Sequence, residues 1–216
     1  MRLFLASEDL GDFPEELLRL AGDGRKLLLI SNARDYYPLE KRVAKIGEKL
    51  AYFKSVGFDA SELDLRNYFG KPEELKAFID EQKPDVIYSI GGNVFLLRTA
   101  MKLSGMDKII IDGVKNDRFV YGGYSAGIMV TCQTLRLYGH DHLVPEKVPE
   151  IYGVEAELDG LGLIDIQLVP HADLPVHLET TKMYMDHFKQ AGKKALALNQ
   201  NAVLIINGDE RRVLGQ

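Results

Sequence analysis

The sequence predicts an α/β fold built on a doubly wound, mostly parallel sheet with a C-terminal hairpin. Short segments rich in Val, Ile and Leu alternate with longer amphipathic segments. Several of the short segments are apolar on both faces, as expected for parallel strands that helices cover on both sides. The connections are only a few residues long, so we expect one βαβ-ordered domain over residues 1–216.

The predicted elements follow this alternation in order. The expected strands are residues 2–6, 26–31, 85–90, 118–121, 162–169 and 202–206. The expected helices are residues 38–56, 72–82, 93–103, 108–115, 127–135 and 176–190. Residues 211–214 pair with the last strand in a hairpin that turns at Asn207-Gly208. Residues 137–162 form the one long irregular region, and loops of that length are usually functional.

Composition narrows the function classes. The 216 residues are 46% hydrophobic and 27% charged, with a net charge of −5, which gives no electrostatic footprint for nucleic acid. One cysteine, Cys132, excludes a disulfide framework within the chain. No stretch reaches the roughly 18 apolar residues of a membrane span, and the N-terminal apolar run is too short for a signal peptide. We expect a cytoplasmic protein without nucleic-acid or membrane partners.

The strongest motif is Gly123-Tyr124-Ser125-Ala126-Gly127, a G-x-S-x-G sequence between a predicted strand and a predicted helix. A serine at such a turn presents its hydroxyl above the carboxyl edge of the sheet. The start of the next helix directs N–H groups and a positive dipole end toward a reacting carbonyl. The pattern arises by chance in roughly one chain of this length in twenty, but its placement favours Ser125 as a nucleophile.

A second turn, Gly91-Gly92-Asn93, ends the predicted strand 85–90 and opens a helix. Its backbone N–H groups, together with that of Ala126, are candidates for an oxyanion hole. A plain tight turn with Asn93 as helix N-cap is the structural alternative, and the two roles are compatible. Both turns follow strands at their carboxyl ends, where open α/β sheets bind ligands.

The candidate general base is His171, which follows Val169-Pro170 at the end of a predicted strand. The proline favours extended geometry before it and ends the strand there. The other histidines lie in a predicted helix or in the long loop: His177, His187, His140 and His142. A metal site of His140, Asp141, His142 and His171 is the alternative, but its spacing matches no strong ligand signature. We expect no metal or organic cofactor.

In order and context, these three motifs resemble the dipeptidase E (aspartyl dipeptidase) family of serine peptidases, which are relatives of the cyanophycinases. The resemblance runs from about Leu3 to Leu214. It implies a flavodoxin-like or glutamine-amidotransferase-like fold and a cytoplasmic exopeptidase that cleaves after an N-terminal acidic residue, often in dipeptides. It also implies that Ser125 is the nucleophile, His171 the base, and Gly92 and Ala126 the oxyanion donors.

The third member of the triad is where the sequence departs from the family. Alignment by eye puts Gln200 at the position of the family's carboxylate, and Asp141 in the long loop is the alternative acid. Three more carboxylates stay open: Glu157, Asp159 and Asp173. Asn93 and Lys182 are the candidate substrate-binding residues, Lys182 being the nearest match to a basic residue of the family that faces the substrate's carboxylate.

These observations predict hydrolysis of short peptides through an acyl-enzyme, most simply dipeptides with N-terminal Asp or a similar residue. Two alternatives stay open. One is a non-catalytic member that binds a small ligand, which the loss of a carboxylate at position 200 would suit. The other is an esterase or amidase, because the serine motif specifies acyl transfer and not the leaving group. The sequence leaves a homodimer open.

Overall fold

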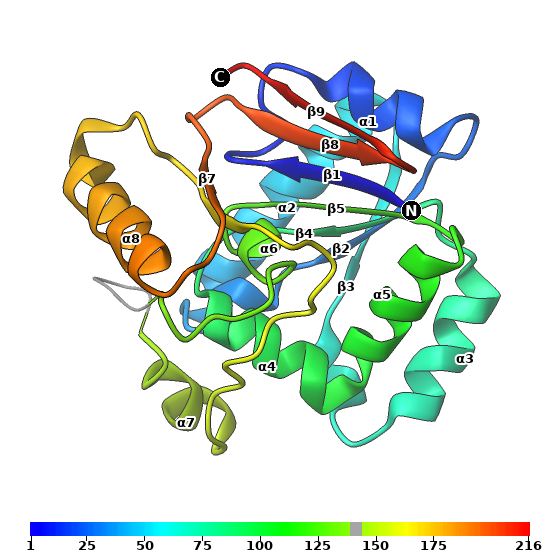
Figure 1. Ribbon diagram of the computed structural model, residues 1–216. Helices are drawn as coiled ribbons and strands as arrows, with labels where there is room; N and C mark the ends of the chain where they lie inside the picture. Colours follow the sequence, from blue (N-terminus) through cyan, green and yellow to red (C-terminus); the bar gives the residue numbers. More distant parts are fainter. Residues whose placement is uncertain (139–143) are drawn as a thin grey trace.

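A seven-stranded sheet forms the centre of the computed structural model, which describes residues 1–138 and 144–216 (Figure 1). Its strand order is β3-β2-β4-β5-β1-β8-β9. The strands are β1 (Arg2–Ala6), β2 (Lys26–Ile30), β3 (Asp59–Leu63), β4 (Val86–Ser89), β5 (Val120–Tyr124), β8 (Val203–Asn207) and β9 (Glu210–Leu214). The first five in the order are parallel, and β8 runs antiparallel to both β1 and β9. The predicted doubly wound sheet, flavodoxin-like and with a C-terminal hairpin, is confirmed.

Helices cover both faces of this sheet (Figure 1). Residues of α1 (Pro14–Ala21) and α2 (Leu39–Val56) pack on one face. The other face carries α3 (Pro72–Gln82), α4 (Val94–Ser104), α5 (Met106–Lys115), α6 (Ala126–Met129), α7 (Lys147–Tyr152) and α8 (Leu178–Gln190). Residues 1–138 and 144–216 also contain three short 3-10 turns: η1 (Asn32–Arg34), η2 (Leu65–Tyr68) and η3 (Pro175–His177).

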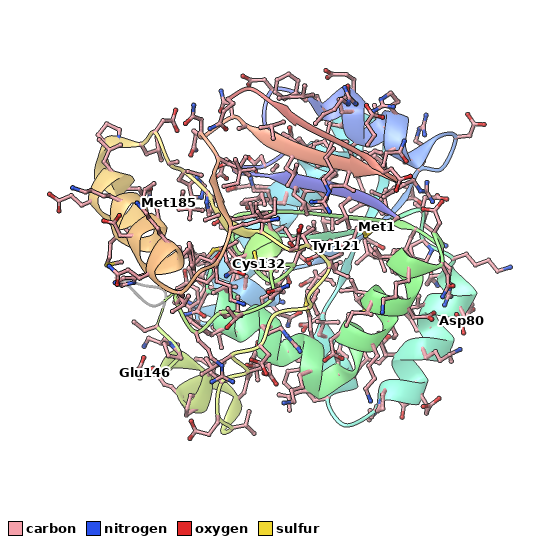
Figure 2. All side chains as sticks on the ribbon, in the orientation of Figure 1. Met1, Asp80, Tyr121, Cys132, Glu146 and Met185 are labelled. Carbon is pink, nitrogen blue, oxygen red and sulfur yellow. The ribbon has the colours of Figure 1, made fainter. Side chains whose placement is uncertain are left out.

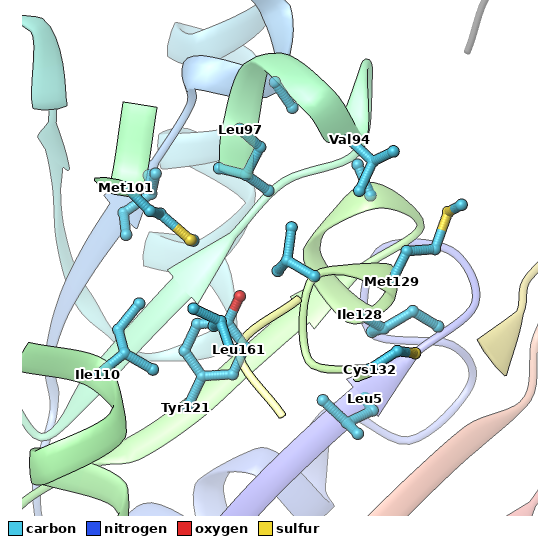
Figure 3. Close-up of a cluster of buried hydrophobic side chains, with 14 of the residues drawn as sticks. Leu5, Val94, Leu97, Met101, Ile110, Tyr121, Ile128, Met129, Cys132 and Leu161 are labelled. Atoms are coloured by element: carbon cyan, nitrogen blue, oxygen red, sulfur yellow. The ribbon is translucent and has the colours of Figure 1, made fainter. Parts of the chain in front are cut away.

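Strand β1 explains why both faces need a cover. Leu3 and Leu5 point into one core and Phe4 and Ala6 into the other, and all four side chains are fully buried. Successive side chains of a strand alternate between faces, so a strand that is apolar throughout requires helices on both sides. Figure 3 shows Leu5 with side chains from β5 and from the segment that begins at α6. In Figure 2, the labelled Tyr121 and Cys132 lie in the interior, whereas Asp80 and Glu146 lie at the periphery.

Two expected elements are much shorter than predicted. The predicted strand 162–169 is reduced to β6 (Gln167–Val169), which pairs with β7 (Ala195–Ala197) in a separate two-stranded sheet. The predicted helix 127–135 ends after a single turn at Met129. Both differences have one cause: Leu161 and Leu163 donate backbone hydrogen bonds to the carbonyls of Val130 and Thr131. A continued helix would use those carbonyls itself.

Four elements are absent from the sequence prediction: α1, β3, α7 and β7. The first of them carries a recognisable start, with Pro14 at the first helical position and acidic residues in the first turn. Strand β3 lies at the edge of the sheet and is only partly buried, so it lacks the apolar run of the central strands. In the described ranges, no helix combines the length and the apolarity needed to cross a membrane.

Candidate active site

Ser125 lies in a tight turn between β5 and α6. Its backbone has φ 50° and ψ −113°, a conformation that costs a non-glycine residue free energy and often marks a functional site. The flanking glycines leave room for this turn, because a Cβ on Gly127 would lie 2.2 Å from the carbonyl oxygen of Ser89. A Cβ on Gly123 would lie 2.9 Å from the same oxygen. The G-x-S-x-G motif therefore forms the close turn that its sequence predicts.

The Gly91-Gly92 turn lies directly against this serine. A Cβ on Gly91 would come within 3.0 Å of the Cβ of Ser125. Gly92 has φ 149°, and a Cβ there would lie 2.3 Å from the carbonyl oxygen of Ala33. Within the part of the chain that the structure describes, the N–H groups of Gly92 and Ala126 have no hydrogen-bond partner. Two backbone donors are thus available beside Ser125, as an oxyanion hole requires.

Asn93 is the N-cap of α4. Its Oδ1 accepts hydrogen bonds from the N–H groups of Phe95 at 2.9 Å and Leu96 at 3.0 Å. Its Nδ2 donates to the carbonyl of Val144, and the residue is 1% exposed. The structure therefore gives Asn93 the capping role that the sequence analysis held as the alternative. A contact with substrate stays a prediction.

His171 follows β6, as predicted, and its ring is held from the Nδ1 side. Nδ1 lies 2.6 Å from Oε1 of Gln200. Because an amide oxygen only accepts, Nδ1 carries the proton in this contact and Nε2 is the unprotonated ring nitrogen of the neutral imidazole. The N–H of Gln200 in turn donates to Oδ1 of Asp173 at 2.6 Å. Gln200 therefore orients the imidazole in the tautomer that a general base needs.

Ser7, which the sequence analysis missed, connects the turn at Ser125 with the segment at His171. Its hydroxyl accepts a hydrogen bond from the backbone N–H of His171 at 2.7 Å. Its carbonyl accepts one from the N–H of Ser125 at 3.2 Å, and its own N–H donates to the carbonyl of Ala202. Ser7 is fully buried at the carboxyl end of β1. Strand order was the missing signal, because only the pairing of β1 with β5 brings position 7 beside Ser125.

The side chains of Ser125 and His171 do not meet in a direct hydrogen bond in the described residues. Their backbones are joined through Ser7 instead. Catalytic hydrogen bonds are often long before substrate binds and tighten in the Michaelis complex. The arrangement therefore fixes the backbones of both residues beside Ser7.

The other candidate acids have different surroundings. Asp141, like His140 and His142, lies outside the described residues. Glu157 pairs with Lys102, and Asp159 pairs with Arg136 at 3.1 Å. Neither contact involves His171. Among residues 1–138 and 144–216, no three His, Cys, Asp or Glu side chains gather in a way that could hold a metal ion.

A carboxylate that the sequence analysis did not consider lies closer. Oε2 of Glu8 is 3.9 Å from Nδ1 of His171. The ring of His171 is 16% exposed and the side chain of Glu8 is 37% exposed. Glu8 follows Ser7 at the carboxyl end of β1, so the same strand contributes both residues.

Lys182 lies on the exposed side of α8 and lines a surface groove formed by residues of that helix alone. No described contact joins it to Ser125 or His171, so its predicted role in substrate binding is still only a prediction. A different cation lies at the site. Arg34 donates from Nε to the carbonyl of Gly91 at 3.0 Å and from Nη2 to the hydroxyl of Tyr124 at 2.7 Å.

With this geometry established, the relatives of the chain become informative. The model of peptidase family S51 matches residues 4–214. The chain belongs to peptidase family S51. Membership confirms the expected family of peptidases.

Individual relatives agree with this assignment. An uncharacterized peptidase of Listeria innocua, Lin0382, is 30% identical over 125 residues, which cover 57% of this chain and 56% of that protein. The chain thus spans little more than half the length of that relative. An uncharacterized peptidase of Listeria monocytogenes, Lmo0363, is 27% identical over 159 residues, or 73% of this chain and 71% of that protein.

Solved structures show the same fold. A candidate peptidase E from Listeria monocytogenes EGD-e superposes with a TM-score of 0.75 at 21% identity, covering 98% of this chain and 96% of the other. A peptidase from an acI-B1 actinobacterium superposes with a TM-score of 0.70 at 15% identity, covering 100% and 87%. At these identities the likeness speaks for the fold alone.

Proposed function

We propose that the protein is a serine exopeptidase in which Ser125 is the nucleophile and His171 the general base. The observation that carries the proposal is the junction at Ser7. One buried residue holds the strained backbone of Ser125 and the backbone of His171, and the Gly91-Gly92 turn lies against the same serine. The nucleophile and the oxyanion donors then come from the carboxyl ends of β5 and β4 in the central sheet, and the base comes from the end of β6 in the two-stranded sheet.

The reaction follows from these roles. The hydroxyl oxygen of Ser125 attacks the scissile carbonyl carbon and its proton passes to Nε2 of His171, while the carbonyl electron pair moves to the oxygen. The N–H groups of Gly92 and Ala126 stabilise that oxyanion. The imidazolium then protonates the leaving amine, the carbon–nitrogen bond breaks, and an acyl-enzyme remains. Water hydrolyses the ester with His171 again as base.

The substrates we propose are very short peptides, in particular dipeptides with N-terminal Asp or a similar residue. The resemblance to the aspartyl dipeptidases supports this class. Arg34 supports it as well, because its guanidinium is fixed at the Gly91 turn and raises the electrostatic potential beside the reacting carbonyl. A neighbouring cation favours an acidic group on the substrate over a neutral one.

Covalent labelling tests the mechanism directly. A fluorophosphonate should label wild-type protein on Ser125 and leave Ser125→Ala unlabelled, with both proteins equally folded by circular dichroism. Labelling at another residue, or equal labelling of the variant, would overturn the nucleophile assignment. A panel of Asp-Xaa dipeptides, Ala-Xaa dipeptides and simple esters then separates an acid-selective peptidase from a general esterase.

Two cations can be compared on that panel. Arg34→Gln should reduce kcat/KM for Asp-Xaa more than for Ala-Xaa substrates, if Arg34 supplies the favourable potential. Lys182→Met applies the same test to the candidate chosen from sequence. If Lys182→Met lowered kcat/KM selectively for Asp-Xaa substrates and Arg34→Gln did not, the preference for acidic substrates would be assigned to Lys182 on α8.

A non-catalytic binding function is the second candidate, and Gln200 is the observation that favours it. Gln200 lies where the family is described with a carboxylate, and an amide carries no charge to stabilise an imidazolium. A binding protein on this scaffold would bind dipeptides without hydrolysing them and would resist the fluorophosphonate. Labelled wild-type protein excludes this alternative.

A further inference from the structure

The 3-10 turn η1 lies against the Gly91-Gly92 turn and fixes the two peptide groups on either side of the Gly92 Cα. Nε of Arg34 donates a hydrogen bond to the carbonyl of Gly91 at 3.0 Å. The carbonyl of Ala33 accepts one from the N–H of Asn93 at 2.8 Å. The orientation of these two peptide groups sets the backbone angles of Gly92, so η1 holds the φ of 149° at this residue.

The first of these peptide groups carries the proposed oxyanion donor. The N–H of Gly92 belongs to the same planar unit as the carbonyl of Gly91, and the peptide bond between them is trans. The carbonyl and the N–H of a trans peptide point in opposite directions. A donor that holds the carbonyl of Gly91 therefore also fixes the direction in which the N–H of Gly92 points.

The contacts of Arg34 suit this role better than a purely structural one. Within residues 1–138 and 144–216, Nε and Nη2 donate to neutral oxygens, and Nη1 is buried without a hydrogen-bond partner. A buried charged N–H without a partner costs stability. A cation in this position polarises the peptide group that it bonds, and polarisation makes the N–H at the other end a stronger donor.

Tyr124 links the same guanidinium to the serine turn. Tyr124 precedes Ser125, its side chain is buried, and its hydroxyl accepts from Nη2 of Arg34 at 2.7 Å. A Cβ on Gly91 would lie 2.6 Å from the ring of Tyr124, so the two turns are in close contact there. One side chain thus bonds both the turn with the proposed oxyanion donor and the residue next to the proposed nucleophile.

We propose that Arg34 is a positioning residue for the oxyanion hole and acts through the peptide group between Gly91 and Gly92, an inference that rests on the proposed function. This role differs from the attraction of an acidic substrate, because a fixed and polarised N–H stabilises the oxyanion of any acyl substrate. Arg34 therefore contributes to the rate of attack even where the substrate has no carboxylate.

An uncharged substrate isolates this contribution. On an uncharged ester, Arg34→Met should lower kcat by about 10- to 100-fold with little change in KM, less than the roughly 10²- to 10³-fold loss of a whole oxyanion donor, because the N–H remains and only its direction and polarity change. Labelling by an uncharged fluorophosphonate should slow by a similar factor, and the Tm should change little. On Asp-Xaa dipeptides the loss should be larger, because the attraction of the acidic group is lost as well.

Two further variants make the test specific. Arg34→Lys keeps the charge, but a single ammonium lacks the fork that reaches both oxygens, so it should retain part of the rate that Arg34→Met loses. Arg25→Met is the matched control. Arg25 also donates to glycine carbonyls in a turn, those of Gly22 and Gly24, but at the opposite end of β2. It should leave kcat and labelling unchanged.

A double variant tests whether Arg34 acts through Gly92. Gly92→Ala displaces this peptide group, because its Cβ would lie 2.3 Å from the carbonyl oxygen of Ala33. Arg34 then has no correctly placed N–H to hold, so adding Arg34→Met should lower kcat little further. Independent roles would instead give losses that multiply.

The outcomes separate this inference from the proposed function. Wild-type protein that resists the fluorophosphonate would overturn both. Wild-type protein labelled on Ser125, together with Arg34→Met labelled at the same rate, would overturn the positioning role alone. A loss confined to acidic substrates, a loss confined to KM, or losses that multiply in the double variant would also overturn it. Should Arg34→Met fail to fold, the same measurements on Arg34→Lys, alone and with Gly92→Ala, decide the question.

Discussion

The hydroxyl of Ser7 accepts a hydrogen bond from the backbone N–H of His171 at 2.7 Å. His171 has φ 60°, a left-handed conformation that is uncommon outside glycine and that contacts with the surroundings help to hold. Ser7 provides that support from inside the sheet, where it is fully buried. The orientation of the proposed base is therefore determined by β1, a strand distant from it in sequence.

Ser7→Ala tests this dependence. The change removes the hydroxyl that accepts a hydrogen bond from the N–H of His171, which costs about 1–3 kcal/mol of stability. We expect kcat to fall more than KM rises, because the base loses its orientation while the substrate pocket remains. The matched control is Ser104→Ala, which removes another fully buried serine hydroxyl at the end of α4. It should lower the Tm without reducing kcat in the folded protein, and an equal loss of kcat in both variants would contradict the positioning role.

Gly92→Ala tests the oxyanion turn. The new Cβ would meet the carbonyl oxygen of Ala33 at 2.3 Å, at a φ of 149° that an alanine rarely adopts. The turn must shift, so its N–H leaves the position where it would stabilise the oxyanion. We expect kcat to fall by about 10²- to 10³-fold, the usual loss for one oxyanion donor.

A second glycine provides the control for that experiment. Gly47 lies in the middle of α2 and is exposed, and a Cβ there meets nothing within 4 Å. Gly47→Ala should raise the free energy of unfolding by up to about 1 kcal/mol and leave kcat unchanged. Full activity in Gly92→Ala would exclude its N–H from the oxyanion hole.

The histidines should differ sharply in their effects. His171→Ala should lower kcat by about 10⁴- to 10⁶-fold, the range for removing a cooperating triad member. His177→Ala should be mild, although its ring lies 5.8 Å from that of His171, and His187→Ala on the exposed side of α8 should be silent. A rate that a chelator abolishes and zinc restores would contradict the serine mechanism and favour the metal alternative.

A buried ion network near the carboxyl ends of β2 and β3 should dominate stability. Arg42 donates to Asp35 at 2.9 Å and to Glu62 at 2.8 Å, and its side chain is 5% exposed. Arg42→Met removes the buried cation that both carboxylates share and leaves Arg66, 3.7 Å from Asp35, as the other cation near that carboxylate, which should cost about 3–5 kcal/mol in urea unfolding. Lys45→Met removes an exposed pair with Glu48 from the same helix and should cost less than about 0.5 kcal/mol. Similar losses would mean that the network is screened by solvent.

Local chemistry was readable from the sequence. The turns at Ser125 and Gly92 depend on glycines at fixed spacing, and the pattern of strand, turn and helix around them is short-range. Alignment with the family predicts Gln200 at the position of the third triad residue. In the structure its Oε1 lies 2.6 Å from Nδ1 of His171. The parallel sheet was also predictable from local sequence, because its central strands are apolar on both faces.

The remaining parts of the site depend on contacts between distant segments. Ser7 and Glu8 reach His171 only because β1 lies between β5 and β8, and a pattern of hydrophobic residues does not specify strand order. Helix α6 is short because the carbonyl groups that follow it accept hydrogen bonds from Leu161 and Leu163. Hydrophobic periodicity reports which face of a segment is buried and not which partner covers it.

Strand β1 lies between β5, which is synthesised early, and β8, which is synthesised late. This location sets the order in which the parts of the proposed site come together. The hydroxyl of Ser7 also contacts the carbonyl of Leu198, a residue 191 positions further along the chain. During synthesis on the ribosome, β1 can pair with β5 long before β8 and the segment carrying Gln200 emerge. A nascent chain therefore carries its proposed nucleophile before its proposed base is oriented, and the proposed site is complete only after the last strands close the sheet.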